Sequence, residues 1–494
     1  MINTSINENI KIIKNSYKNS PDITFRKIKV NNVNILLVFN QSLASSAFIN
    51  DFILKNLTDI ATSNDNISPK NIISYFNNVI PGNNLKDVHS FDEVYDFLGN
   101  SFTLIFFEGE RSCFAVETRA TLNRAISEPL TEQTISGPKD AFNENYIINI
   151  GLIRKRIKTT NLVLEEKVLG RETKTRVGVL YMDNIIEDTL LDEVRKKLDD
   201  IDIDGILDST TIKNMIVSKN SVFSLVETTE RPDVATSSLL EGKIIIVVEN
   251  SPFVLIIPTF FTDLFLSSED NYQMNKNVSF TRILRYASFL LAILTPAFYI
   301  AITTYNHETI PVSLLVNFAA QREGVPFPAI IEAIGMSLVF EILRESDIRM
   351  PHLSGSAISI LGAIVLGDAA VTAGIVSPIM VIVIAVSAIC SLMFSHVSVS
   401  NAIRFWRFIF MIFATCFGIP GIFLCGILFV IILSDMKSFG KPYLYPIAPF
   451  NGNMLKNVLV KLNIKKEKKR NPLLTDKNFT RMTNKNSIKD GECK

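Results

Sequence analysis

The chain has 494 residues, of which 47% are hydrophobic and 20% are charged, with a mean hydropathy of +0.26. A soluble globular protein carries about a quarter charged residues, so this composition favours a membrane protein. The 50 basic and 49 acidic residues nearly cancel, which argues against a general nucleic-acid binder, and the five cysteines and four histidines show neither disulfide nor zinc spacing.

The first part of the chain has the patterns of a mixed α/β protein. Residues 1–20 are polar, lack the apolar run of a signal peptide and are predicted to be a flexible N-terminus. Residues 21–121 are expected to form a first α/β subdomain, in which Ser90 and Glu93 form a capping box before a helix. Strands are predicted in it at Ile28–Val30, Val33–Phe39, Phe102–Phe107 and Cys113–Glu117.

A polar linker and a second α/β subdomain follow. Residues 122–141 contain Pro129, Gly137 and Pro138 and are predicted to be the linker, and residues 142–275 the subdomain. The second subdomain has predicted strands at Thr175–Met182, Lys243–Glu249 and Phe253–Ile257 and predicted helices over Phe142–Lys158, Glu187–Leu198 and Asp233–Glu241. We therefore expect a fragment of residues 21–275 to fold by itself.

Beyond Arg282 the chain becomes strongly apolar. Four long runs are candidate membrane spans, because about 20 apolar residues cross a bilayer core: Ile283–Thr303, Ser356–Thr372, Ile375–Phe394 and Phe405–Ser434. The fold class is therefore an α/β region of two subdomains followed by an α-helical, multi-pass membrane domain, which we place at residues 280–440. The last run is interrupted at Gly418-Ile419-Pro420-Gly421.

The charges that flank these runs predict the topology. Arg282 and Arg285 precede the first run, and residues 441–494 form a basic tail, so the positive-inside rule places both ends in the cytoplasm and requires an even number of crossings. Four crossings follow if Pro328–Arg344 lies in the interface and residues 403–434 form one broken helix. Six follow if the first crosses and the second is a hairpin. The tail is predicted either to be disordered or to bind anionic lipid headgroups.

The sequence contains no common catalytic signature. A phosphate-binding loop, a dinucleotide fingerprint, a His-Glu-x-x-His motif and a Gly-x-Ser-x-Gly motif are all absent, so we predict neither an enzyme nor a cofactor or metal site.

Small residues along one predicted helix are candidates for a pore or gate. They recur at steps of three and four and are Ser359, Ala363, Gly367, Ala370 and Gly374. Such spacing lets helices approach closely, either in ordinary packing or in a narrow seam between subunits. Asp368 lies beside them in an apolar run, and it is either a functional carboxylate or an interfacial group near a helix end.

Two further carboxylates, Glu332 and Glu341, are candidate intramembrane charges. They lie in the segment Pro328–Arg344, where Glu341 shares one broad helical face with four isoleucines and a leucine and both glutamates have apolar neighbours. The segment is predicted to be an interfacial amphipathic helix, a re-entrant segment or the wall of a water-filled cavity.

Several motifs carry a family resemblance. In the α/β region they are Gly137-Pro138-Lys139-Asp140-Ala141-Phe142, Asn149-Ile150-Gly151-Leu152-Ile153-Arg154-Lys155-Arg156-Ile157, Glu230-Arg231-Pro232-Asp233-Val234 and Leu239-Leu240-Glu241-Gly242-Lys243. In the membrane region they are Arg322-Glu323-Gly324-Val325-Pro326-Phe327-Pro328, Glu341-Ile342-Leu343-Arg344-Glu345, Leu366-Gly367-Asp368-Ala369-Ala370-Val371 and Ser438-Phe439-Gly440-Lys441-Pro442-Tyr443. With them, the chain resembles the A subunit of the GerA-type spore germination receptors of endospore-forming bacteria.

The resemblance covers most of the chain and implies a function. It implies a nutrient receptor subunit in the spore inner membrane, which works with a transporter-like B subunit that holds the germinant and with a C subunit lipoprotein. It also implies that the subunit forms homo-oligomers and forms or gates a cation path. The motif residues carried over in the α/β region are Arg154, Arg156, Arg231, Pro232, Asp233 and Gly242. Ser337-Leu338-Val339 departs from the family pattern, where an acidic residue is frequent. A transporter subunit and a non-conducting scaffold remain the alternatives.

Overall fold

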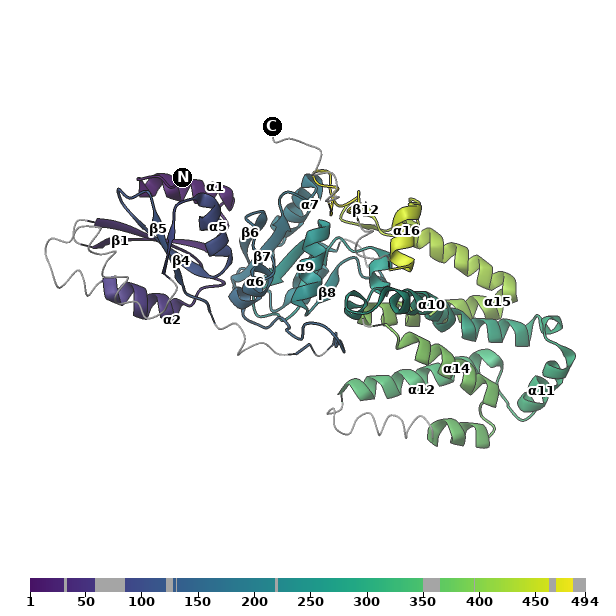
Figure 1. Cartoon of the computed structure of the whole chain (residues 1–494). Coiled ribbons are helices and arrows are strands. Elements are labelled where there is room, and N and C mark those ends of the chain that lie inside the picture. The colour runs from purple at the N-terminus through teal and green to yellow at the C-terminus, as the bar shows by residue number, and fades with distance from the viewer. Residues whose placement is uncertain are drawn as a thin grey trace.

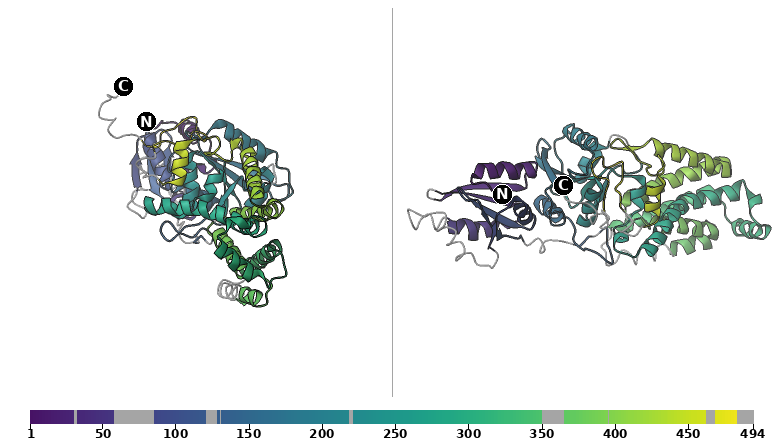
Figure 2. Two further views of the ribbon diagram at one scale, coloured as in Figure 1. Left: turned by 90° about the vertical axis from the view of Figure 1, so that its right-hand side faces the viewer. Right: turned by 45° about the horizontal axis from the view of Figure 1, so that its top comes forward.

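The computed structural model describes residues 1–30, 33–57, 85–120, 128–129, 131–217, 221–349, 365–394, 396–461 and 468–482. Two five-stranded sheets and a group of helices follow one another along the long axis (Figure 1), and the right-hand view of Figure 2 shows the same order. We call them the first sheet unit (residues 1–120), the second sheet unit (residues 131–274) and the helical unit (residues 275–435).

The first sheet is antiparallel, with the order β1-β2-β4-β5-β3. Its strands are β1 (Ile23–Val30), β2 (Val33–Asn40), β3 (Leu85–Val88), β4 (Phe102–Phe107) and β5 (Cys113–Glu117). In β2, Ile35 and Leu37 point to one face, and Leu36 and Val38 point to the other. Because both faces are apolar, helices cover both.

One face of the first sheet is covered by α2 (Ser46–Phe48) and the π-helical turn η1 (Ile49–Leu54). The other is covered by α1 (Ile6–Ser16) and α5 (Phe91–Gly99). The capping box predicted for α5 is confirmed, because the Ser90 hydroxyl accepts from the Glu93 N–H and the Glu93 carboxylate accepts from the Ser90 N–H, both at 3.3 Å.

The prediction that residues 1–20 are flexible is wrong. Ile6 and Ile13 of α1 and the following Tyr17 are buried against the first sheet. The asparagine-rich composition hid the helical spacing of these apolar residues, which places them on one face. A fragment that begins at residue 21 would lose this cover, so the first sheet unit needs residues 1–20.

The second sheet repeats the plan of the first, with the antiparallel order β6-β7-β9-β10-β8. Its strands are β6 (Leu162–Leu169), β7 (Thr175–Met182), β8 (Glu227–Thr229), β9 (Ile244–Val248) and β10 (Val254–Ile257). On one face lie α6 (Tyr146–Arg154) and α9 (Pro232–Glu241), and on the other lie α7 (Asp188–Asp199) and α8 (Ser209–Ile216). In both units, each strand occupies the same place in the sheet as its counterpart in chain order, and the described helices lie at corresponding points before and between the strands. This agreement indicates a structural duplication.

The described helices of the helical unit begin after two 3-10 turns, η2 (Phe261–Phe265) and η3 (Ser268–Asn271). They are α10 (Asn275–Thr304), α11 (Val312–Arg322), α12 (Ala329–Arg349), residues 365–372, α14 (Pro378–Ser391) and α15 (Val397–Asp435), with the 3-10 turn η4 (His307–Thr309) between α10 and α11. Among the described residues, Lys276–Thr304 and Val397–Phe417 are long and apolar enough to cross a membrane, and Pro378–Ser391 and Ile419–Asp435 form shorter apolar helices.

The long helix α15 is a hairpin, as one of the two sequence-based alternatives requires. Gly418 has φ +65° and ψ −143°, which lies outside the helical region. Trp406 and Phe410, before this break, contact Phe429, after it, with ring centroids 4.7 and 6.4 Å apart. The Ile419 N–H donates to Asn306 Oδ1 at 3.3 Å, so the turn of the hairpin lies at the end of α10 that points away from the sheets.

After α15 the chain returns to the second sheet unit. A two-stranded hairpin of β11 (Lys437–Ser438) and β12 (Lys441–Pro442) is followed by α16 (Gly452–Leu459). The Ser438 hydroxyl accepts from the Thr259 N–H at 3.1 Å and donates to the Leu225 carbonyl at 2.8 Å. Phe439 enters the core beneath α7 and α8. The second sheet unit is thus completed by residues from the far side of the helical unit.

The predicted disorder of the tail does not hold for residues 468–482. Leu474 and Thr475 are buried, Lys477 Nζ lies 2.6 Å from Asp188 Oδ1, and Arg470 donates to the Leu240 carbonyl at 2.9 Å. Composition suggested a solvated basic run, but two leucines and the acidic first turn of α7 provide apolar and ionic contacts within the chain.

Candidate functional site

The charged residues predicted inside the helical unit are paired. Glu332 in α12 has a fully buried side chain, and its Oε2 accepts from the N–H and the hydroxyl of Ser377, both at 2.9 Å. Ser377 is the N-cap of α14, where a carboxylate is stabilised by the helix dipole. Arg322 at the end of α11 lies 3.5 Å from Glu332 Oε1. Glu332 therefore joins α11, α12 and α14.

Glu341 binds two arginines of α15. Its Oε1 lies 2.9 Å from Arg407 Nη2, and its Oε2 lies 2.9 Å from Arg404 Nε. The Arg407 side chain is 1% exposed and also donates to the Ser387 hydroxyl of α14 at 3.4 Å. Ser387 donates to the Ala292 carbonyl of α10 at 2.5 Å. This network links four helices, and a charge in an apolar region is stable only with such partners.

The predicted pore residues are only partly within the described chain. Ser359 and Ala363 lie outside the described residues. Gly367 is buried, and a β-carbon on it would lie 3.8 Å from Val381 of α14 in the same chain. Gly374 has φ +66°, and Asp368 is exposed. The structure therefore places Gly367 against its own chain and leaves Asp368 on the surface.

The motif residues of the α/β region hold loops and units together. Arg154 is 3% exposed and binds Asp22 of the first sheet unit through Nε and Nη2 at 2.8 and 3.1 Å. Arg156 binds both oxygens of Asp140, at 2.7 and 2.6 Å. These two arginines fix α6 to the first sheet unit and to the end of the predicted linker.

Arg231 anchors the described part of that linker. Its buried guanidinium binds both Asp233 oxygens, at 3.0 and 2.9 Å, and donates to the carbonyls of Glu132 and Pro138 at 3.1 and 2.8 Å. Pro232 is the first residue of α9, as predicted. The Glu230 carboxylate also accepts from the N–H groups of Thr131 and Glu132, so residues 131–138 are bound to the second sheet unit through two neighbouring side chains, Glu230 and Arg231.

Gly242 ends α9 in the left-handed region, with φ +100°, and a β-carbon on it would lie 2.8 Å from the Leu474 carbonyl oxygen of the tail. We expect Gly242→Ala to lower the free energy of unfolding by about 2 kcal/mol, because backbone strain and a clash with the tail combine. Gly109→Ala is the matched control, because Gly109 has φ +91° but nothing within 4 Å of a β-carbon. Thermal unfolding and limited proteolysis of the tail measure both effects, and equal effects would contradict the clash.

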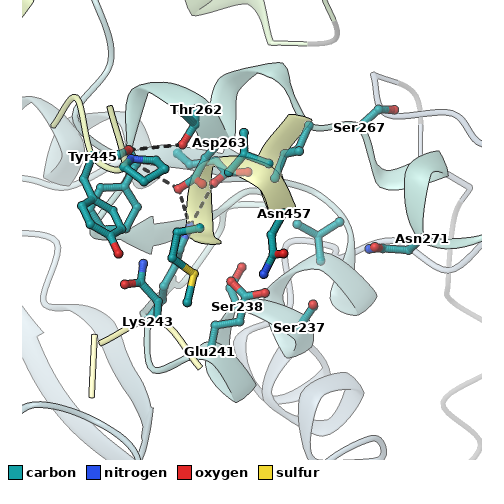
Figure 3. Close-up of a pocket in the computed structure, with 18 of the residues that line it drawn as sticks. Ser237, Ser238, Glu241, Lys243, Thr262, Asp263, Ser267, Asn271, Tyr445 and Asn457 are labelled. Carbon is teal, nitrogen blue, oxygen red and sulfur yellow. Dashed lines mark hydrogen bonds and ion pairs between the residues drawn. The ribbon is translucent and has the colours of Figure 1, made fainter. Parts of the chain in front are cut away.

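Sequence reasoning missed a pocket where the second sheet unit meets the helical unit. Its volume is about 270 Å³, and it is lined by α9, η2, η3, α16 and residues of the tail (Figure 3). At its centre, Lys243 Nζ lies 2.7 Å from Asp263 Oδ2 and 4.0 Å from Glu227 Oε2. His396, the N-cap of α15, also lines it. Lys243 lies within a family motif, but its partners are distant in sequence.

Burial shifts the protonation of several groups in this pocket. It raises the pKa of Glu227 to about 7 and that of Glu132 to about 7, and it lowers the pKa of His396 to about 4. Burial opposes the charge of Lys243, but Asp263 and Glu227 outweigh it and hold the Lys243 pKa above its usual range. Across the described residues, no group of three or more histidine, cysteine, aspartate or glutamate side chains could hold a metal ion.

The arginines predicted to set the topology bind an acidic residue of η3. Asp270 Oδ2 accepts from Arg282 Nε at 3.0 Å, and both Asp270 oxygens accept from Arg285 at 2.8 Å. Burial acts to raise the pKa of Asp270, but the three bonds from Arg285 and Arg282 outweigh it and hold the pKa below its usual range. Arg282 also donates to the carbonyls of Asn457 and Val458 at the end of α16. This ion-pair cluster connects the first helix of the helical unit to η3 and to α16.

Comparison with known proteins agrees with the resemblance. A family model described as Bacillus/Clostridium GerA spore germination protein matches residues 11–473. Spore germination protein KA of Bacillus subtilis (strain 168) is 37% identical over 467 residues, which cover 94% of this chain and 85% of that protein. Spore germination protein B1 of the same strain is 30% identical, covering 93% of this chain and 95% of the relative.

Two further comparisons concern the membrane and a solved structure. The membrane protein YfkQ of B. subtilis (strain 168) is 35% identical over 466 residues, which cover 93% of this chain and 89% of that protein. A crystal structure of the N-terminal domain of the A subunit of the Bacillus megaterium spore germinant receptor GerK3 is 27% identical. It covers 53% of this chain and 97% of its own chain, with a TM-score of 0.41.

Proposed function

Because the chain belongs to the GerA family of spore germination proteins, we propose that it is the A subunit of a germinant receptor in the spore inner membrane, where it couples nutrient sensing to ion release. It works with a B subunit and a C subunit lipoprotein and is not an enzyme. The family match supports this proposal, because it extends from residue 11 to residue 473 and so includes both sheet units and the helical unit.

We infer six crossings of the membrane. The hairpin in α15 and the length of α12 favour six crossings over four. Five crossings are α10, α12, α14 and the two halves of α15, and the sixth is the apolar run Ser356–Thr372 expected from the sequence. Both ends of the helical unit meet the second sheet unit, through the Arg282–Asp270 and Ser438–Thr259 contacts. An even number of crossings follows, and both sheet units and the tail then lie on the cytoplasmic side.

The observation that carries the coupling function is that the helical unit is attached to the second sheet unit at both of its ends. α10 begins at the Asp270 ion pairs, and α15 is followed by Ser438 and Phe439, which are built into the second sheet unit. A displacement of the second sheet unit therefore moves the helices at two points. The Glu341–Arg407 network then carries the displacement from α15 to α12 and α14.

The ion path is proposed to lie between copies of the chain. Asp368 is exposed on the helix of residues 365–372, on a surface that lipid, water, a partner subunit or another copy can cover in a membrane. In a homo-oligomer this carboxylate faces a shared aqueous path and favours cations over anions.

Asp368→Asn tests the path. We expect assembly to persist and cation flux through the purified receptor complex in lipid vesicles to fall about fivefold, the effect of about 1 kcal/mol of lost attraction. Glu308→Gln is the control, because Glu308 is an exposed carboxylate in η4, outside the proposed crossings. Equal flux in both variants at equal protein level would contradict the assignment of the path.

A specific observation supports a second candidate, a non-conducting relay subunit. Gly367 lies against Val381 of its own chain, as ordinary helix packing requires. If vesicles that contain the purified complex show no cation flux at all, while the chain still binds the B and C subunits, the relay function is favoured over the channel.

A further inference from the structure

Titratable side chains from several parts of the chain meet where the second sheet unit joins α15. Glu227 opens β8, Lys243 follows α9, Asp263 lies in η2, and His396 is the N-cap of α15. Glu227 Oε1 lies 3.9 Å from His396 Nε2, and Glu227 Oε2 lies 4.0 Å from Lys243 Nζ. The side chains of Glu227 and His396 are only 9% and 12% exposed. Water therefore does little to stabilise a charge on either.

Among the described residues, few positive groups or hydrogen-bond donors are available to stabilise a negative charge on the Glu227 carboxylate. The ammonium group of Lys243 lies 2.7 Å from Asp263 and is thus already engaged in a closer ion pair. Within the described part of the chain, no hydrogen bond to the Glu227 carboxylate is found, although its backbone N–H donates to the Thr259 hydroxyl at 2.7 Å. A buried carboxylate with these surroundings favours its protonated form.

Some of the groups around Glu227 and His396 raise the pKa of these two side chains, and others lower it. The charged groups that act on them from the neighbouring elements are Lys213 of α8, Lys243, Asp263 and Glu132, and Glu241 of α9 acts on Lys243. Burial and Asp263 raise the pKa of Glu227, Lys243 and Lys213 lower it, and the result is about 7. Burial lowers the pKa of His396 to about 4; Asp263 opposes this shift, and Lys213 and Lys243 add to it. Between about pH 4 and pH 7, the pair Glu227 and His396 therefore carries one proton on Glu227, and it loses that proton as the pH rises through about 7.

We propose that Glu227 and His396 form a proton-binding site that links the protonation state of the second sheet unit to the position of the N-terminus of α15. With the proton bound, the pair is neutral, and a carboxyl O–H can approach the imidazole nitrogen. With the proton lost, a buried carboxylate lies beside the neutral imidazole of the N-cap residue of α15, and no proton is left for a hydrogen bond between the carboxylate and a bare imidazole nitrogen. Because α15 also carries Arg407, a displacement at its N-cap reaches the Glu341 network.

The direction of the pH effect follows from the pKa of Glu227. Its folded value of about 7 lies above the ordinary value of 4.5. Its contribution to stability is therefore fully present below about pH 4.5 and is lost as the pH rises through about 7. Proton release from the site thus weakens the joint between the second sheet unit and α15.

The chain contains one tryptophan, Trp406, which provides a reporter for α15. It is buried nine residues after the start of the helix and packs on Phe429 with ring centroids 4.7 Å apart. We expect the emission of Trp406 in the full-length chain, purified in detergent, to titrate with a midpoint near pH 7. Glu227→Gln should abolish that titration, because glutamine keeps the shape and cannot release a proton.

Two further variants separate this site from its neighbours. Glu132→Gln is the matched control, because Glu132 has the same raised pKa of about 7 and lines the same pocket. Its carboxylate accepts from the Thr229 hydroxyl at 2.6 Å, whereas the ion-pair contact with His396 belongs to Glu227, so the Glu132 variant should still titrate. His396→Asn keeps a good N-cap residue and removes the imidazole. In that variant the Trp406 response should be lost, while the infrared band of a protonated carboxyl still titrates.

The proposal is overturned by a flat Trp406 emission in the wild type, by a titration that survives Glu227→Gln, or by its loss in Glu132→Gln. If Glu227→Gln does not fold, Glu227→Asp decides the question, because the shortened side chain moves the carboxyl away from His396. A changed midpoint or amplitude supports the proposal, and an unchanged titration overturns it.

Discussion

Replacing Glu341 with glutamine is expected to lower the free energy of unfolding by about 3–5 kcal/mol, the usual effect of breaking a buried ion pair. The carboxylate binds both Arg404 and Arg407 at 2.9 Å. Without it, the buried guanidinium of Arg407 retains only a 3.4 Å contact with the Ser387 hydroxyl as a polar partner among the described residues. Unfolding in mixed detergent micelles, followed by the emission of Trp406, measures the loss.

A double variant tests whether the loss comes from the pair. Glu341→Gln with Arg407→Gln should be less destabilised than the sum of the single variants, by about 1–3 kcal/mol. Asp368→Asn is the control, because it removes an exposed carboxylate from the same unit and should change stability by less than about 0.5 kcal/mol. A cost of Glu341→Gln as small as that of Asp368→Asn would show that the network does not stabilise the helices.

Arg154→Met is expected to separate the two sheet units, at a cost of about 3–5 kcal/mol. Arg154 and Asp22 are 3% and 4% exposed, and the same guanidinium donates to the Leu162 carbonyl at 2.7 Å. The substitution leaves a buried carboxylate in the first sheet unit. Thermal unfolding of the full chain measures the cost, and limited proteolysis between residues 120 and 131 measures the separation.

Lys158→Met is the matched control for Arg154→Met. Lys158 also connects the two units, through a 2.6 Å bond to Asn100, but the contact is exposed and should contribute less than about 1 kcal/mol. Arg154→Lys keeps the positive charge but cannot form the two-bond contact of the guanidinium with Asp22, so we expect an intermediate loss of unfolding free energy. If all three variants behave alike, the buried ion pair does not hold the units together.

Elements with a clear local signal could be predicted from the sequence. The predicted strands at Phe102–Phe107, Cys113–Glu117 and Thr175–Met182 coincide with β4, β5 and β7, because apolar residues and flanking turn residues mark both ends. Pro232 and Gly242 marked the start and the exit of α9 for the same reason. By contrast, β6 carries charged residues in its second half, and the three residues of β8 are too few for a pattern. Both were missed.

The candidate site shows the limit of local patterns. Glu332 and Glu341 were identified because a charge within an apolar segment is conspicuous. Their partners, however, lie on other helices, and only packing brings Arg407 next to Glu341 across 66 positions of sequence. Glu227 and His396 had no local signal at all, because each is unremarkable in its own segment. The duplication of the sheet units escaped notice for a related reason, since strand order is a property of pairing and not of residue type.

The return of residues 437–443 to the second sheet unit has a consequence for how the protein is made. The Thr259–Ser438 and Leu225–Ser438 bonds connect residues 179 and 213 positions apart, and Phe439 belongs to the core beneath α7 and α8. As the ribosome works from the N-terminus, the first sheet unit can close early, but the second lacks part of its core until the last apolar helix has been synthesised. Packing of α10 against α15 brings the two distant segments together. If the helical unit crosses a bilayer as proposed, its correct insertion becomes a precondition for completing the core of the second sheet unit, and a chain that inserts wrongly keeps an incomplete core that proteases can recognise.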